Sequence, residues 1–142
     1  MVSRKEERSM DPRDAISGRE VFLRLEGKDL KAEEIEKLFS PLGFFTLRLD
    51  GTKIVNKADL LAALAAGLKF PAYFGHNWDA LLDCLRSLPD FIKAGGYAVI
   101  IENSGFFLIN SPSDRNDFRD IAETAAVFLA EKYKLRLKII ML

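Results

Sequence analysis

The chain has 142 residues, of which 49% are hydrophobic and 30% charged, and its 21 basic residues equal its 21 acidic ones. This length predicts one domain with an apolar core, and the balanced charge argues against a general nucleic-acid or membrane binder, which needs a basic excess. A single cysteine, Cys84, allows no internal disulfide and indicates a reducing compartment, here expected to be the cytoplasm.

The N-terminal part of the chain is expected to add to a main domain rather than belong to it. Residues 1–19 are polar and charged without a clear period, which predicts a mobile tail, and they lack the apolar stretch of a secretory signal. Val21-Phe22-Leu23-Arg24-Leu25 predicts a short strand, and residues 31–40 carry apolar side chains at helical spacing. Residues 20–40 are therefore expected to form one extra strand–helix unit before the domain of residues 41–142.

The main domain alternates strand patterns with helix patterns. Asn56 is expected to cap the first of its helices, Pro89 to stop the second, and Ser113 or Asp114 to cap the third. Strands separated by helices predict an α/β fold with a small parallel sheet of three core strands. The strands are expected at residues 44–49, 97–101 and 135–142, and the helices at 57–69, 76–88 and beyond 113.

Residues 70–85 form the most informative segment of the chain. It consists of a proline breaker, an aromatic loop, Gly75 and a helix. On a wheel of about 100° per residue, the tryptophan and leucines of that helix gather on one face, which is predicted to be buried. Asp79, Asp83 and Arg86 share another face, so the helix is expected to present an acidic ridge. Gly75 is expected to need backbone dihedrals that other residues rarely adopt.

Two interpretations of the paired aspartates are open from the residues themselves. Asp79 lies in the first helical turn, where the helix dipole favours a carboxylate, and Arg86 can pair with Asp83 three residues before it. These features favour a solvated surface. Like charges four residues apart also repel each other, which makes the pair an unusual choice for stability alone.

Catalytic and metal-binding chemistry find little support. His76 and Cys84 are eight residues apart on one predicted helix, about 12 Å, which is too far for a nucleophile and its base. His76 and Asp79 offer two metal ligands, but spacing suggests no third. No glycine-rich phosphate loop follows a predicted strand. We therefore expect no enzyme activity, no metal and no cofactor.

The segment from Pro71 to Leu85 resembles the signature of the barstar family: Pro, any, Tyr, aromatic, Gly, any, Asn, any, Asp, Ala, Leu, any, Asp, Cys, Leu. The resemblance extends over roughly residues 43–142 and leaves residues 1–40 without a counterpart. It implies an intracellular inhibitor, an immunity protein, that plugs the substrate cleft of a secreted ribonuclease. The two aspartates would stand in for RNA phosphates in a basic cleft, and no nucleic acid, membrane or small molecule would be bound directly.

The resemblance also implies roles for single residues. Asp83 matches the central inhibitory aspartate, Asp79 its neighbour, and Tyr73 the aromatic residue that packs on the partner. Three positions depart from the best-known member: Leu82 replaces a tryptophan, His76 an acid, and Ala130 a partner-contacting glutamate, beside Glu131. The resulting prediction of the partner-binding set is Tyr73, Phe74, Gly75, His76, Asn77, Asp79, Leu82, Asp83 and Arg86.

A second function stays open at this point. The chain could be a non-inhibitory interaction domain of the same fold, in which residues 20–40 form an extra edge that binds another protein or a second copy.

Overall fold

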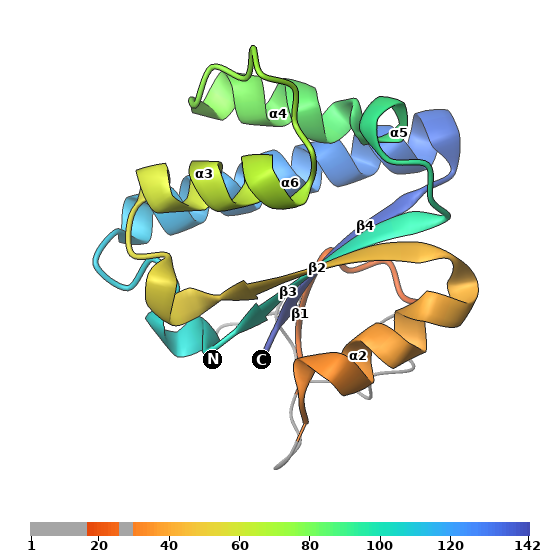
Figure 1. Cartoon of the computed structure of the whole chain (residues 1–142), viewed down its shortest axis with the longest axis horizontal. Coiled ribbons are helices and arrows are strands. Elements are labelled where there is room, and N and C mark those ends of the chain that lie inside the picture. The colour runs from red at the N-terminus through yellow and green to blue at the C-terminus, as the bar shows by residue number, and fades with distance from the viewer. Residues whose placement is uncertain (1–16, 26–29) are drawn as a thin grey trace.

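The computed structural model describes residues 17–25 and 30–142, and at its centre four parallel strands form one sheet in the order β1-β4-β3-β2 (Figure 1). The strands are β1 (Phe22–Arg24), β2 (Phe44–Asp50), β3 (Gly96–Glu102) and β4 (Arg136–Met141). The α/β class and the three predicted core strands are confirmed. Residues 26–29, between the predicted extra strand and its helix, and the first sixteen residues of the predicted tail lie outside the described residues.

The predicted extra strand joins the same sheet as the core strands. β1 pairs with β4 in parallel, so that Phe22 lies opposite Ile139, and Val99 of β3 lies opposite Ile139 on the other side. A parallel neighbour must be reached by a crossover connection, and here the whole main domain separates β1 from β4. β1 and β2 are therefore the two outer strands of the sheet.

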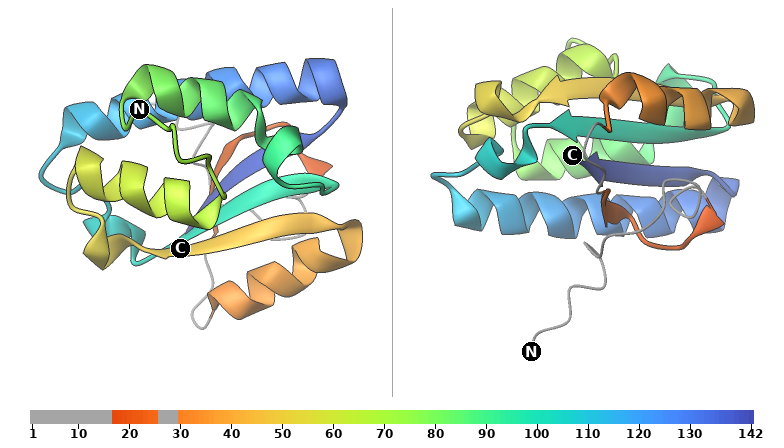
Figure 2. Two further views of the ribbon diagram at one scale, coloured as in Figure 1. Left: turned by 45° about the horizontal axis from the view of Figure 1, so that its top comes forward. Right: turned by 90° about the horizontal axis from the view of Figure 1, so that it is seen from below.

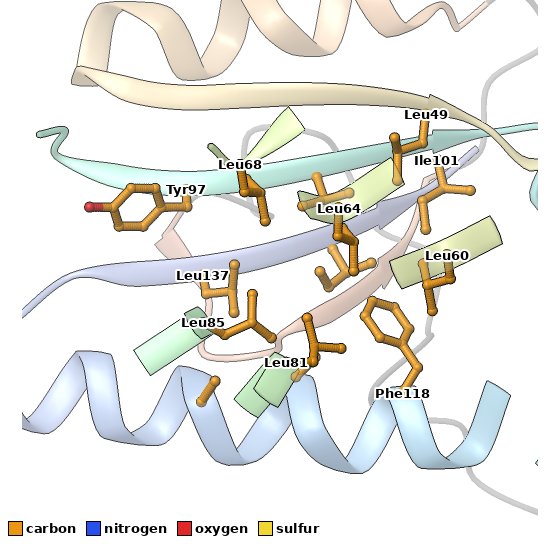
Figure 3. Packing of buried hydrophobic residues seen from close by; sticks show 14 of the residues in the cluster. Leu49, Leu60, Leu64, Leu68, Leu81, Leu85, Tyr97, Ile101, Phe118 and Leu137 are labelled. Atoms are coloured by element: carbon orange, nitrogen blue, oxygen red, sulfur yellow. The ribbon is translucent and has the colours of Figure 1, made fainter. Parts of the chain in front are cut away.

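Three helices cover one face of the sheet: α3 (Lys57–Gly67), α4 (Trp78–Arg86) and α6 (Pro112–Tyr133) (Figures 1 and 2). Their apolar faces meet the sheet in the main core, where Leu64, Leu81 and Ile101 lie close together (Figure 3). Asn56 caps α3 as predicted, because its side-chain oxygen accepts a hydrogen bond from the Asp59 amide at 2.9 Å.

Helix α2 (Ala32–Phe39) covers the opposite face of the sheet (Figure 1). Its Ile35 and Phe39 are almost fully buried in a second apolar cluster with Ile100 and Ile140. At the edge of this layer the Arg48 guanidinium donates a 2.6 Å hydrogen bond to the Glu36 carboxylate. The strand–helix extension therefore supplies both a sheet strand and the cover of the second sheet face.

Two predicted helix boundaries are wrong. The second helix of the main domain ends at Arg86, and Pro89 lies inside a separate short helix, α5 (Leu88–Phe91), where a proline in the first turn needs no amide hydrogen bond. α6 begins at Pro112, so neither Ser113 nor Asp114 is its cap; Ser111 occupies that position without a side-chain hydrogen bond. The described residues also contain three short 3-10 turns: η2 (Ser40–Leu42), η3 (Gly51–Lys53) and η4 (Ser104–Phe106).

Replacing Tyr97 by phenylalanine is expected to destabilise the core. The Tyr97 side chain is fully buried, and its hydroxyl donates a 2.7 Å hydrogen bond to the Ile92 carbonyl. Tyr97→Phe would leave that carbonyl without this donor at a cost of about 1–3 kcal/mol, measurable by urea unfolding. Tyr73→Phe, the same change at an exposed tyrosine, should lower the free energy of unfolding by no more than about 0.5 kcal/mol. If the two substitutions lowered the free energy of unfolding equally, the role assigned to the hydrogen bond of Tyr97 would be contradicted.

A buried lysine holds the segment that precedes β1. The Lys138 side chain is 2% exposed, and its ammonium donates hydrogen bonds of 2.7 Å to the carbonyls of Gly18 and Glu20. The neighbouring Arg136 guanidinium donates to the carbonyls of Ser17 and Gly18. Burial, and secondarily the charge of Arg136, lower the pKa of Lys138 from 10.5 to about 8.

This shift predicts a rise in stability between about pH 8 and pH 10. In that window Lys138 has lost its proton in the folded chain and keeps it in the unfolded chain. Because the unfolded state binds more protons, the free energy of unfolding rises with pH. The full gain is about 3 kcal/mol. Urea unfolding across this range should show the rise, and Lys138→Met should lack that component. If the free energies of unfolding of the unmodified chain and of Lys138→Met changed with pH in the same way, Lys138 would not titrate as described.

Candidate functional site

Helix α4 starts where the sequence pattern changes from aromatic loop to helix. The Asn77 side-chain oxygen accepts a 2.8 Å hydrogen bond from the Ala80 amide, and its side-chain nitrogen donates to the Gly75 carbonyl at 3.2 Å. An asparagine cap of this kind satisfies a free amide of the first turn and fixes the direction of the helix. Asn77 and Gly75 therefore hold the loop and the helix together.

The buried face of α4 is the one that the wheel predicts. Leu81, Cys84 and Leu85 are buried, whereas Trp78 and Leu82 are half-buried at the margin of the core. The Lys57 ammonium lies 5.0 Å from the centre of the Trp78 ring. Burial, followed by the charge of Asp83, raises the pKa of the Cys84 thiol, so this side chain is a core residue and a poor nucleophile.

The acidic face of α4 points to solvent. Asp79 and Asp83 are both exposed, and the Asp83 side chain keeps 74% of its surface free. The Arg86 guanidinium donates a 2.8 Å hydrogen bond to the Asp83 carboxylate, the pairing that the spacing predicts. The same guanidinium lies 5.6 Å from the centre of the Phe128 ring on α6. Asp83 therefore faces solvent with one internal cation already beside it.

The two aromatic residues before α4 point in different directions. Tyr73 is 81% exposed, the most exposed of the large apolar side chains in the described part of the chain. Phe74 is 6% exposed and packs between the rings of Phe70 and His76, whose centres lie 5.1 and 4.7 Å away. Of this pair, Tyr73 can contact a partner directly, and Phe74 holds the loop onto the core.

The expectation of unusual dihedrals at Gly75 is wrong. The left-handed conformation lies one residue later, at His76, with φ of 50°. Histidine enters this region more readily than most side chains, and here its Nδ1 lies 3.1 Å from the Phe74 carbonyl, which supports the turn. At Gly75 the constraint is space, since a Cβ atom there would lie 3.1 Å from the Asn77 side-chain nitrogen.

Helix α6 contributes one residue that the sequence analysis does not single out. Phe128 is half-buried beneath Arg86, and the Lys132 ammonium lies 5.4 Å from the same ring. Ala130 is about 160° away around the helix and lines a cavity next to the segment before β1. The spacing of Phe128 within α6 was visible in the sequence, but its contact with α4 is a tertiary one.

Together these residues form a surface suited to binding cations. Two exposed carboxylates lie on a helix whose opposite face is anchored in the core, so a partner can meet them without rearrangement of the backbone. Within residues 17–25 and 30–142, no cluster of three or more histidine, cysteine, aspartate or glutamate side chains is arranged to hold a metal ion. Over the same ranges, no helix combines the length and apolar character needed to cross a membrane.

The chain matches a known protein family. The family model described as Barstar (barnase inhibitor) matches residues 44–140, more than half of the chain. The match starts at the first residue of β2 and stops one residue before the end of β4, so β1 and α2 lie outside it. No curated protein matches the chain.

Proposed function

The chain belongs to the barstar family, and from this premise we propose that it inhibits a ribonuclease or a related nuclease by placing α4 in the basic active-site cleft. One observation carries the proposal: Asp79 and Asp83 are exposed on the same face of a helix whose other face is buried. The carboxylates occupy the places of two substrate phosphates and accept charge-assisted hydrogen bonds from arginine and lysine side chains of the cleft. The chain blocks the cleft and carries out no reaction itself.

The anchoring of α4 makes this mechanism efficient. Leu81 and Leu85 fix the helix on the core, and the Asn77 cap fixes its first turn, so little conformational entropy is lost when the partner binds. Tyr73, with most of its surface free, adds apolar contact area beside the charged groups. The predicted partner is a secreted, basic nuclease, and the chain protects the cytoplasm of the cell that makes it.

The proposal is tested by measuring inhibition and binding together. Catalytically active barnase, as the enzyme named in the family description, and any nuclease encoded beside this gene serve as probes. A stoichiometric loss of RNA cleavage, with a complex visible by calorimetry, supports the proposal. Binding without inhibition, or a complex in which the α4 amide signals do not change, contradicts it.

Arg86→Ala is expected to tighten binding to a basic cleft. Arg86 competes for Asp83 at 2.8 Å and brings a positive charge to the surface that would meet other positive charges. Because exposed ion pairs are weak, the gain is modest, up to about tenfold in the dissociation constant. Lys132→Ala is the matched control, since Lys132 also lies over Phe128 but, within the described residues, the ion-pair partner of Asp83 is Arg86 and not Lys132. Weaker binding after Arg86→Ala would mean that Arg86 meets an acidic group of the partner.

A non-inhibitory interaction domain is the second candidate function. It is favoured by the position of β1, an outer strand of the sheet that lies outside the residues matched by the family model. Edge strands offer unpaired backbone groups to another chain. A captured partner whose affinity is unaffected by Asp79→Ala and Asp83→Ala would favour this function.

A further inference from the structure

A cavity of about 410 Å³ lies on the side of α6 that is turned away from Phe128 and the acidic face of α4. Its walls come from the C-terminal end of α6, the first residues of β4, and Gly18, Arg19 and Val21 ahead of β1. Volumes of this size are typical of small-ligand sites in proteins. Because Gly18, Arg19 and Val21 lie outside the matched part of the chain, the cavity depends on residues that precede the match to the family model.

The cavity combines apolar walls with positive charge. Val21, Ala126, Ala130 and Leu137 supply apolar surface. Four basic residues also line it, and none of its described lining residues is acidic; the basic four are Arg19, Lys134, Arg136 and Lys138. In a chain whose basic and acidic residues are equal in number, four cations around one cavity amount to a local excess. An apolar cavity with convergent cations is complementary to an anion that carries an apolar body.

The hydrogen bonds that hold the segment before β1 account for only part of this group of basic residues. Lys138 and Arg136 donate to the carbonyls of residues 17, 18 and 20, which secures the segment beside β4. An ammonium has three donors, and these hydrogen bonds use two of those on Lys138. The acceptors of these four hydrogen bonds are three neutral carbonyls, so the hydrogen bonds do not neutralise the two charges. The nearby charge of Glu20 raises the pKa of Lys138 less than burial and the charge of Arg136 lower it. Lys134 and Arg19 also line the cavity, and neither of them donates any of these four hydrogen bonds.

We propose that this cavity binds a small organic anion with a carboxylate head and an aliphatic body. The carboxylate lies among Lys134, Arg136 and Lys138, and the aliphatic body lies against Val21 and Ala130. This site does not depend on the proposed nuclease inhibition, because it involves a different side of α6 and none of the residues of the acidic face.

Octanoate is the probe, and octanol and octyltrimethylammonium are its neutral and cationic counterparts. Titrations of the full chain followed by amide NMR should show saturable shifts at Ala130, Leu135 and Leu137 with octanoate. A charge-assisted hydrogen bond predicts an affinity about tenfold or more above that of octanol, with no binding of the cation. Equal affinity for octanol, shifts only at other amides, or no saturable shift would overturn the proposal.

Two variants locate the head group. Lys138→Met should remove most of the preference for octanoate over octanol while keeping the aliphatic side-chain stem. Because Lys138 is buried and its loss could unfold the chain, Lys134→Ala at an exposed position is the second variant, with an expected loss of about threefold to tenfold in octanoate affinity. Lys132→Ala, two residues away on the same helix and outside the cavity, is the control. Unchanged octanoate affinity in both cavity variants would overturn the assignment.

Discussion

Asp83→Ala is expected to abolish detectable inhibition of the partner nuclease while leaving the chain folded. In the proposed complex the Asp83 carboxylate is enclosed by cations of the cleft, and its removal leaves those cations buried without a counter-charge. Loss of one member of a buried ion pair costs about 3–5 kcal/mol, which corresponds to a loss in affinity of about 10²- to 10³-fold or more. The free protein should tolerate the change, because the Asp83 side chain is 74% exposed.

The measurement pairs calorimetric binding to the nuclease with urea unfolding of the free variant. Asp90→Ala is a matched control, since Asp90 is an exposed carboxylate on the adjoining helix α5 and not part of the acidic face. It should bind like the unmodified chain. If Asp83→Ala retains normal affinity and inhibition, the acidic-helix mechanism is wrong, even though membership of the family stands.

Much of the main domain follows from local patterns. The Asn56 cap and the apolar spacing of the helices place α3 and α4 to within a few residues, although Asn77, inside the expected range of residues 76–88, is the cap of α4. The apolar run of residues 97–101 predicts a strand that is buried on both faces, and β3 is such a strand. Local patterns did not show where α6 begins, since Ser113 and Asp114 look like caps and the helix starts with Pro112 instead.

Some features of the candidate site could likewise be predicted from local patterns, and others could not. A helical wheel separates the exposed Asp79 and Asp83 from the buried Leu81 and Leu85, because both follow from one helix and its period. It says nothing about the contact between Arg86 and Phe128, which joins α4 to α6 across 42 residues of chain. The burial of Phe74 and the left-handed turn at His76 also depend on how the loop packs, which no periodic pattern records.

The place of the extension was the least predictable part of the fold. A short strand such as β1 carries no signal for its partner, and its pairing with β4 links residues more than a hundred positions apart. One indication was present in the sequence. A central strand that is apolar on both faces needs a second covering layer, and the helices of the main domain cover only one face. Helix α2 is that second layer.

Removal of residues 1–39 is therefore expected to destroy the fold rather than to leave an isolated inhibitory domain. Five large apolar side chains of the extension are almost fully buried; they are Phe22, Leu23, Leu25, Ile35 and Phe39. At about 1.5–3 kcal/mol each, their burial contributes an amount comparable with the whole stability of a typical domain, about 5–15 kcal/mol. The truncation would also uncover Ile100 and Ile140 and take away the carbonyl partners of the buried Lys138. We expect a chain that is unfolded or aggregated, by circular dichroism and size-exclusion chromatography.

A chain that begins at Ser17 is the matched control, because it keeps β1, α2 and the carbonyls that Lys138 and Arg136 bind. Its free energy of unfolding should stay within about 1 kcal/mol of that of the full chain, since the described core is intact. The comparison also separates the two candidate functions. A chain lacking residues 1–39 that folded and still inhibited the nuclease would show that α2 is a dispensable cover. One that folded and lost its partner would move the binding surface from α4 to the extension.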